Sequence, residues 1–204
     1  MTKRQLAAAE TRKKLVEAAK KIICEKGLTN TSIDEITESC NVSKGTFYTY
    51  FKRKEDIVYE LSAKMFDEIL DNAQNSKGSV IKRLENYMIH FSRYIECGGV
   101  KLTQEWIKNV VDPDISDVGA NKLKKDISAV TDLLQSGLYN KELTPEINIS
   151  NTAETINDIL YGQMLCWSLS GGSYSFEKRT KEFCGIFLNE IIKPYLNRKE
   201  NDDL

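Results

Sequence analysis

The stretch TSIDEITESCNVSKGTFYTYFKRKED, residues 31–56, contains two short helical patterns separated by a break. Ser32 and Glu35 have the S-x-x-E spacing of a capping box, which predicts that the first helix begins there. In the break, Asn41 belongs to the residue types that tolerate a positive φ, and Ser43 can cap the helix that follows. Two short helices joined by a tight turn are the pattern of a helix-turn-helix unit, so the stretch predicts one.

The second of these helices, expected over residues 44–51, has two chemically different sides. At 100° per residue, Phe47 and Phe51 share one side and are expected to pack against a core. The opposite side is small or hydroxylated, has no carboxylate, and includes a glycine, which weakens a helix by roughly 0.5–1 kcal/mol relative to alanine. A helix that enters the major groove of DNA needs such a thin surface without negative charge. The residues of this side are Gly45, Thr46, Thr49 and Tyr50.

Nearly every other segment repeats apolar residues at the spacing of a helix. In TRKKLVEAAKKIICEKG, for example, Leu15, Ala18 and Ile22 fall on one apolar stripe. Gly and Pro number only 11 and 3 among the 204 residues, which argues against a turn-rich β architecture. The sequence therefore predicts an all-α fold of about nine helices, three short ones and then about six longer ones. We expect a DNA-binding domain at residues 1–54 and a second helical domain at residues 55–204.

Charge is distributed unevenly along the chain. Residues 1–54 carry 12 Lys/Arg and 6 Asp/Glu, a net charge of +6, whereas the remaining residues carry 17 and 24, a net charge of −7. A basic head on an acidic body indicates that only the head meets a polyanion.

The composition argues against several other classes of protein. No apolar run approaches the roughly 20 residues that span a bilayer, and the N-terminus lacks the apolar core of a signal peptide, so we expect a cytoplasmic protein without a membrane partner. The five cysteines form no C-x-x-C pair and His90 is the only histidine, so we expect neither a metal site nor a cofactor. With so few catalytic groups and no phosphate loop, we do not expect an enzyme. An all-α adaptor that binds another protein is the alternative, and salt-sensitive binding to duplex DNA would separate the two.

The segment TSIDEITESCNVSKGTFYTYFKRKEDI resembles the DNA-binding segment of the TetR family of bacterial transcriptional regulators. The resemblance is specific over roughly residues 11–57, and beyond them only the length and the helical pattern agree. Asn41 stands where the family often has glycine, and asparagine can form the same turn. The resemblance implies a helix-turn-helix domain followed by a helical domain for effector binding and dimerisation. It also implies a ligand-responsive regulator, more often a repressor than an activator, that binds a palindromic operator as a homodimer.

The resemblance further implies roles for individual residues of the head. Two serines would cap helices and offer groups to phosphates, and the first turn of the second helix would face base edges. Two tyrosines would reach the DNA backbone or thymine methyl groups, and a lysine after the helix would hold a phosphate. The expected DNA-binding residues are Ser32, Ser43, Lys44, Gly45, Thr46, Tyr48, Thr49, Tyr50 and Lys54. At the N-terminus, Lys3 and Arg4 either add DNA contacts or belong to a solvated basic tail.

The helix expected from residue 149 to about residue 169 has one stripe of mostly small residues. Small residues let two helices approach closely, and with apolar residues of the last helix they suggest a four-helix interface between two copies of the chain, as the resemblance implies. Burial of this helix within a monomer is the alternative. The expected interface residues are Thr155, Ile159, Gly162, Cys166, Leu169, Phe183, Phe187 and Ile191.

Aromatic residues and methionines of the middle helices could line a cavity for a small-molecule effector, because drug-sized pockets are mainly apolar. Each of them could equally belong to a plain core, and the resemblance supplies the main reason to expect a pocket. The candidates are Phe66, Met88, Phe91, Trp106, Tyr139, Tyr161, Met164 and Trp167. The expected mechanism is a population shift, in which the effector favours one spacing of two heads, and the helix that begins at residues 54–55 joins head and body.

Overall fold

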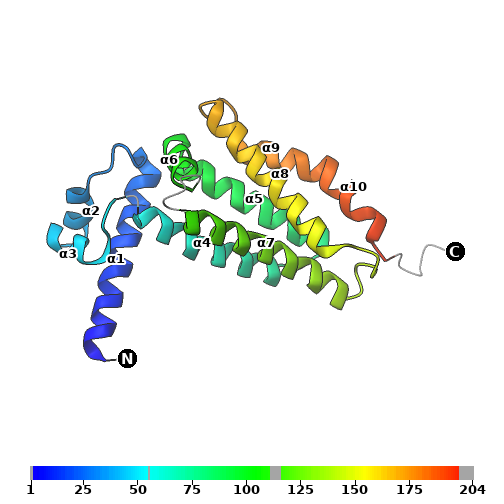
Figure 1. The fold of residues 1–204 in the computed structure, drawn as a ribbon, viewed down its shortest axis with the longest axis horizontal. Helices are drawn as coiled ribbons and strands as arrows, with labels where there is room; N and C mark the ends of the chain where they lie inside the picture. The colour runs from blue at the N-terminus through cyan, green and yellow to red at the C-terminus, as the bar shows by residue number, and fades with distance from the viewer. Residues whose placement is uncertain (1, 55, 111–115, 198–204) are drawn as a thin grey trace.

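The computed structural model describes residues 2–54, 56–110 and 116–197. All regular elements in these ranges are helices, and the one β-type contact among them is an isolated bridge between Leu143 and Leu196. The expected all-α fold is therefore confirmed. The helices form a small head and a larger body at opposite ends of an elongated molecule (Figure 1).

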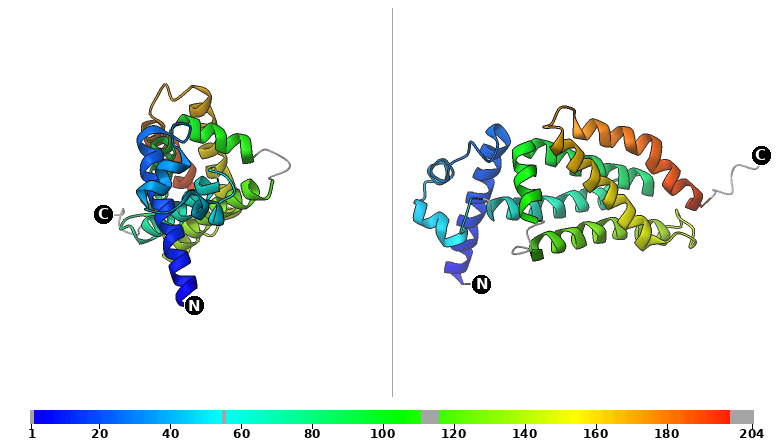
Figure 2. Two further views of the ribbon diagram at one scale, coloured as in Figure 1. Left: turned by 90° about the vertical axis from the view of Figure 1, so that its left-hand side faces the viewer. Right: turned by 45° about the horizontal axis from the view of Figure 1, so that its top comes forward.

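Three helices build most of the head: α1 (Lys3–Lys26), α2 (Ile33–Ser39) and α3 (Lys44–Tyr50). α1 begins earlier than the sequence pattern indicated, because Thr2 and Gln5 form a capping box at its N-terminus. Its first turns extend beyond the rest of the head, as two views of the ribbon show (Figures 1 and 2). The basic N-terminal segment is thus a helical arm.

The body contains the longer helices. They are α4 (Asp56–Asn75), α5 (Val80–Gly98), α6 (Val100–Val110), α7 (Ser116–Tyr139), α8 (Ile149–Leu169) and α9 (Phe176–Phe183). α9 continues without a break through a π-helical turn (Cys184–Leu188), α10 (Asn189–Ile192) and a 3₁₀ turn (Lys193–Tyr195). This continuous segment corresponds to the single last helix expected from the sequence.

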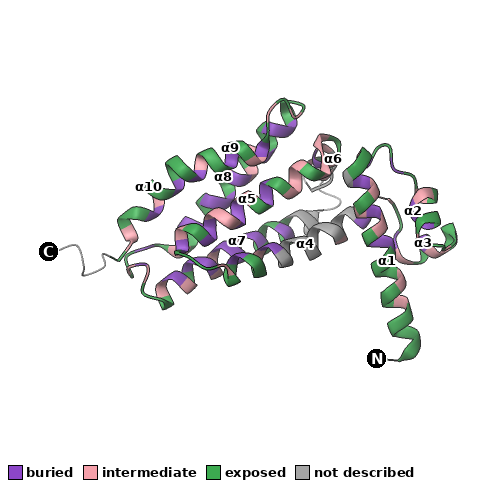
Figure 3. Ribbon diagram, turned by 180° about the vertical axis from the view of Figure 1, so that it is seen from behind, coloured by how far each residue is buried: buried purple, intermediate pink, exposed green. Residues whose placement is uncertain are grey.

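Each part has its own hydrophobic core. Leu15, Ile36, Phe47 and Phe51 are buried together in the head, whereas a larger buried cluster runs through the body between α5, α7, α8 and α9. Buried residues accordingly lie on the inward sides of the helices (Figure 3). Burial of this apolar surface is the main favourable contribution to the stability of each part.

Several helices of the body contact the head, and α1 packs against both α4 and α5. Ile57, in the first turn of α4, is fully buried in the head core, so the head packing extends past the division that we predicted at residue 54. Leu102, on α6, also packs against the head core. On the outside, Arg12 of α1 pairs with Glu60 of α4 at 2.6 Å. The head is therefore fixed to the body through α4 and α6 together.

Candidate nucleic-acid interface

The orientation of α3 is set by a cap and by two aromatic rings. The Oγ of Ser43 accepts a hydrogen bond from the backbone N–H of Thr46 at 3.2 Å, which confirms the predicted cap. Phe47 and Phe51 are buried in the head core with their ring centroids 5.3 Å apart. Because these rings hold one side of α3 against the core, the opposite side faces solvent.

Gly45, Tyr48 and Thr49 form the exposed side of α3, which we call the α3 outer face. The Tyr48 side chain is 51% exposed and stands edge-on to Phe47. The Oγ1 of Thr49 donates to the carbonyl oxygen of Gly45 at 3.0 Å, so the hydroxyl hydrogen is used within α3. A Cβ at position 45 would meet only the Oγ of Ser43, at an ordinary 3.6 Å. The packing of the chain itself therefore does not explain the glycine, whereas close approach of a partner would.

Two other residues expected on this side turn partly inward. Thr46 is half-buried, and its Oγ1 lies 3.0 Å from the Oγ of Ser43. Tyr50 is half-buried and packs against the head core beside Phe51. The helical wheel assumed a helix through residue 51, but α3 ends at Tyr50 and Phe51 has an extended backbone. Tyr50 therefore faces solvent less than the sequence pattern indicated, because its ring packs against the head core.

Lys44 begins α3 and forms an ion pair with Asp34 of α2 at 3.0 Å. The hydrogen bond that the Lys44 ammonium donates to this carboxylate, together with the negative charge of Asp34, raises the pKa of Lys44. A carboxylate therefore lies next to the first turn of α3, although α3 itself contains none, and the sequence pattern of α3 alone could not reveal this neighbour. Both side chains are exposed, and exposed ion pairs are weak, so a DNA phosphate could replace Asp34 as the partner of Lys44.

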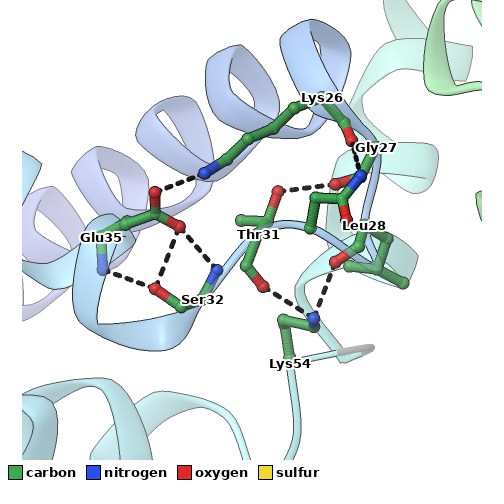
Figure 4. A network of polar contacts seen from close by, with 8 residues as sticks. Lys26, Gly27, Leu28, Thr31, Ser32, Glu35 and Lys54 are labelled. Carbon is green, nitrogen blue, oxygen red and sulfur yellow. Dashed lines mark hydrogen bonds and ion pairs between the residues drawn. The ribbon is translucent and has the colours of Figure 1, made fainter.

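The start of α2 is stabilised by a capping box of the kind that the sequence predicted. The Oγ of Ser32 accepts from the backbone N–H of Glu35 at 3.1 Å, and the carboxylate of Glu35 accepts from the backbone N–H of Ser32 at 2.9 Å (Figure 4). Glu35 also pairs with Lys26 at the end of α1. The Lys26 ammonium, followed by the two groups of Ser32, lowers the pKa of Glu35 to about 2. The Ser32 hydroxyl is thus occupied by the cap.

Lys54 forms contacts within the head that the sequence pattern did not predict. Its ammonium donates to the carbonyl oxygens of Leu28 and Thr31, both at 2.7 Å, and so closes the loop between α1 and α2 (Figure 4). The Thr31 hydroxyl donates in turn to the carbonyl oxygen of Gly27 at 2.8 Å. The Lys54 ammonium thus ties the loop after α1 to the start of α4, and the phosphate contact expected of it stays a prediction.

The N-terminal arm carries two exposed cations. Lys3 and Arg4 lie in the first turn of α1, where they form no ion pair with any residue in the described ranges. Lys14, further along, pairs with Glu10 on the same helix at 3.2 Å. Lys3 and Arg4 are accordingly the cations of α1 that are best placed to meet a polyanion.

A cavity lies in the body between α5, α6, α7 and α8. Its volume is about 40 Å³, measured as room for the centres of water molecules, which is enough for water but far below the size of a drug-sized pocket. Four of the expected effector-pocket residues line it, namely Phe91, Trp106, Tyr161 and Met164.

The other four candidates lie elsewhere. Met88 and Trp167 are buried in the body core without lining this cavity, and Tyr139 is 89% exposed at the end of α7, which removes it from any interior pocket. The side chain of Phe66 lies outside the described residues. Periodicity placed all four on helices, but it could not show which helical side would face the cavity.

The sequence pattern missed the charged part of the cavity. Lys122 lines the cavity and is nearly buried, and its ammonium pairs with Asp126, one helical turn further along α7. The hydroxyl of Tyr161 donates to the second oxygen of Asp126 at 2.6 Å. Burial, with the neighbouring Asp126 charge, raises the pKa of Tyr161, so this hydroxyl stays protonated. A Lys and an Asp four residues apart look like an ordinary surface pair in the sequence, so only their burial identifies them.

The expected dimer stripe lies largely on the surface of the described chain. Leu169 is 75% exposed and Phe187 is 55% exposed, and Gly162 has nothing within 4 Å of a Cβ built on it. Thr155 and Cys166 are also exposed, whereas Ile159, Phe183 and Ile191 are half-buried. Leu165 and Ile186, which the sequence pattern did not single out, are exposed next to them in the chain. We call the exposed apolar surface of α8 and of the segment after α9 the α8–α10 face.

No group of three or more His, Cys, Asp or Glu side chains in the described residues could hold a metal ion. Within the same ranges, every helix is too short or too polar to cross a bilayer.

Comparison with known sequences identifies the head. Residues 15–61 match the family model described as bacterial regulatory proteins, tetR family. The transcriptional regulator UidR of Escherichia coli is 25% identical over 173 residues, which cover 79% of this chain and 84% of that regulator. The transcriptional repressor KstR2 of Mycolicibacterium smegmatis is 23% identical over 190 residues, which cover 91% of this chain and 92% of that repressor.

Comparison with solved structures supports the fold of the whole chain. A transcriptional regulator from Cytophaga hutchinsonii superposes with a TM-score of 0.67 at 21% identity, over 86% of this chain and 95% of that one. The reduced form of Escherichia coli NemR superposes with a TM-score of 0.61 at 20% identity, over 89% and 97%. The family match covers the helices whose geometry is described above, and the similar proteins share the architecture of head and body. Residues 15–61 therefore match the helix-turn-helix segment of the TetR family of bacterial regulatory proteins, and the chain as a whole is similar to DNA-binding transcription regulators.

Proposed function

We propose that the protein is a repressor that binds a palindromic operator as a homodimer and leaves it when a small molecule enters the body. The single observation that carries this proposal is the α3 outer face, which is exposed, thin at Gly45 and without a carboxylate of its own. Such a surface fits the major groove, where base edges are read. The relative KstR2 is named a transcriptional repressor, which supports repression rather than activation.

Several charged and aromatic groups around the α3 outer face support DNA binding. Lys44 would exchange Asp34 for a phosphate or a base acceptor, and Tyr48 would contact the backbone or a thymine methyl group. Lys3 and Arg4 of the N-terminal arm would add contacts to the flanking backbone or the minor groove. The net charge of +6 on residues 1–54 would make this binding sensitive to salt.

The α8–α10 face supports the proposal of a homodimer. Large apolar side chains such as Leu169, Ile186 and Phe187 are exposed there, and a contiguous exposed apolar surface is typical of an interaction site. Gly162 on the same helix allows a second helix to approach closely. A two-fold pair of these faces would place two α3 helices for two half-sites about one helical turn apart, roughly 34–36 Å, or a little more.

The response to an effector would pass through α6 as well as α4. Leu102 lines the cavity and also packs against the head core, so it touches both sites. Gln104, two residues further on, donates to the carbonyl oxygen of Ser168 and fixes α6 to α8 at 2.9 Å. Because the cavity is only about 40 Å³, an effector must push a wall outward, and movement of α6 would shift the head. The effector can lower the DNA affinity only as far as it binds the released arrangement of the heads more tightly than the DNA-bound arrangement.

The direct test is selection of DNA from the native genome. Purified protein is mixed with sheared genomic DNA, and the bound fragments are sequenced. The proposal predicts enrichment of a few fragments that share an inverted repeat with half-sites about one helical turn apart. Recovery of unrelated fragments, or of none, would favour an adaptor that binds another protein.

A further inference from the structure

We propose that Lys44 and Asp34 together read one G·C base pair in each half-site, with the Lys44 ammonium on guanine and the Asp34 carboxylate on the amino group of the paired cytosine. This inference rests on the proposed DNA binding and deepens it, because it names the base pair that the first turn of α3 recognises. It depends on the position of Asp34, on the geometry of its ion pair and on the pattern of groups in the major groove.

A carboxylate beside a helix that enters the major groove requires an explanation. Asp34 is exposed in the first turn of α2 and pairs with Lys44 in the first turn of α3, next to Gly45 of the α3 outer face. DNA phosphates repel a negative charge at such a position. The amino groups of cytosine and adenine, however, are donors in the major groove, and a carboxylate can accept from them. Asp34 is therefore better suited to a base edge than to the DNA backbone.

The start of α2 does not require Asp34. Glu35 closes the capping box with Ser32 and pairs with Lys26, so its carboxylate is used within the head (Figure 4). Glu35 also supplies the negative charge that the N-terminus of a helix favours. The carboxylate of Asp34 is directed toward Lys44 instead, and each of its two oxygens lies 3.0 Å from the Lys44 Nζ.

The ion pair can open when DNA approaches. The side chains of Lys44 and Asp34 are 52% and 59% exposed, and exposed ion pairs are weak because water screens both charges. DNA separates such a pair at little cost if each charge finds a new partner. The nature of the two new partners then decides which base pair is preferred.

A G·C pair offers both partners at a matching distance. In the major groove, guanine presents the acceptors N7 and O6, and cytosine presents the N4 amino group as a donor. A hydrogen bond of the base pair joins O6 and N4, so these atoms lie about 3 Å apart, close to the spacing of the Lys44 and Asp34 charges. The Lys44 ammonium turns to O6 and N7, and the carboxylate that it leaves accepts from N4.

Other base pairs satisfy this arrangement less well. An A·T pair offers the ammonium one acceptor on adenine in place of two, and it places the thymine O4 acceptor where the carboxylate needs a donor. A pair in the reversed orientation brings the carboxylate to guanine O6, which is also an acceptor. The expected preference is therefore for guanine on one strand at one position of each half-site.

The first test compares the base preferences of full-length proteins. Wild type, Asp34→Ala and Glu38→Ala are each mixed with duplexes of randomised sequence, and the bound duplexes are sequenced. We expect wild type to prefer G·C at one position of each half-site by about tenfold, and Asp34→Ala to lose this preference while other positions stay selective. Glu38→Ala removes the same charge from an exposed position of α2 and, as the control, should keep every preference.

Modified bases then assign each half of the contact by fluorescence anisotropy. At the preferred position, 7-deazaguanine removes the N7 acceptor and N4-methylcytosine removes the N–H that faces the groove. Each should weaken binding of wild type by about threefold to tenfold. With Lys44→Met the 7-deazaguanine duplex should cause no further loss, and with Asp34→Ala the N4-methylcytosine duplex should cause none. A contact that only holds α2 to α3 would not couple one side chain to one base atom in this way.

The inference is overturned if Asp34→Ala keeps the wild-type preference at every position, or if N4-methylcytosine weakens Asp34→Ala as much as wild type. A uniform loss of affinity of Asp34→Ala for all duplexes would also overturn it, because that result indicates a purely structural ion pair. In each of these cases wild type still selects DNA, so the proposed regulator function stands. Absence of salt-sensitive duplex binding by wild type would contradict that function, and the G·C assignment with it.

Discussion

At the scale of single residues, Gly45 gives a sharp test of the α3 outer face. Alanine fits at this exposed position without a clash, so Gly45→Ala is expected to raise the stability of the head by about 0.5–1 kcal/mol. If the DNA backbone or base edges approach here, the added methyl group should lower operator affinity by about tenfold or more. Thermal denaturation and fluorescence anisotropy with operator DNA measure the two effects. A stabilised protein with unchanged DNA affinity would show that α3 does not enter the groove at this residue.

Lys54 is expected to act through the fold of the head. Lys54→Met removes two charged hydrogen bonds to the carbonyl oxygens of Leu28 and Thr31, and should destabilise the head by about 1–3 kcal/mol. Where the variant head is still folded, the slope of log K against log salt should equal that of the wild type. The exposed Lys52 supplies the matched control, because Lys52→Met should leave stability unchanged. A shallower slope of log K against log salt for Lys54→Met, without loss of stability, would instead support a contact between Lys54 and a DNA phosphate.

Local sequence rules succeeded at some residues and failed at others for physical reasons. The caps at Ser32 and Ser43 depend on neighbours three residues away, so the sequence could predict them. The contacts of Lys54 with Leu28 and Thr31 cross more than 20 residues of chain, and no local pattern encodes them. No local pattern encodes the ion pair of Lys44 with Asp34 either, because the partner comes from a different helix.

At the scale of elements, the cap of α2 makes the head sensitive to acid. The folded-state pKa of Glu35 is depressed from 4.5 to about 2, so its stabilising contribution is present above pH 4.5 and is lost as the pH falls toward 2. The difference in urea midpoint between wild type and Glu35→Gln should therefore shrink as the pH falls through this window. Glu38→Gln, on the exposed side of the same helix, is the control and should show no such trend. A constant difference for Glu35→Gln at all pH values would contradict the role of this cap.

The α8–α10 face can be tested at Gly162. Because nothing lies within 4 Å of a Cβ at this position, leucine fits the folded single chain, and Gly162→Leu should keep its helical content and thermal stability as a monomer. The larger side chain should prevent close approach of a second α8, so we expect monomers in light scattering and loss of operator binding. A Gly162→Leu protein that is still a dimer would place the interface elsewhere.

The bounds of a helix were predicted accurately where the apolar periodicity and the capping or helix-breaking residues agreed. They were predicted less accurately where only one of these two signals was present. α8 matches the range expected from residue 149 to about residue 169, and an asparagine cap marks its start. The π-helical turn at Cys184–Leu188 contains Gly185, but one glycine within a helical pattern does not specify a π-helical turn, so sequence rules could not locate it. α1 was expected to be shorter because its first turns lie beyond the apolar stripe and bury little surface.

At the scale of the whole molecule, the all-α fold and the head followed from the sequence, whereas the cavity did not. Apolar residues on a helix predict that a side is buried, but core and cavity wall have the same composition. Tyr139 and Met88 illustrate the limit: one is exposed and the other is packed in the core, although both fit an effector pocket by type. The charged groups of the cavity, Lys122 and Asp126, became visible only through their burial.

The most direct measurement is a salt series of duplex binding by fluorescence anisotropy with the fragment that the protein selects from genomic DNA. Thr49→Glu places a carboxylate on the α3 outer face, and Ser128→Glu makes the same charge change on the exposed side of α7. We expect wild type and Ser128→Glu to bind equally, with affinity falling steeply as salt rises, and Thr49→Glu to bind at least tenfold more weakly at every salt concentration. Full affinity of Thr49→Glu, or binding of wild type that salt does not weaken, would contradict the assignment of α3 as the DNA-reading helix.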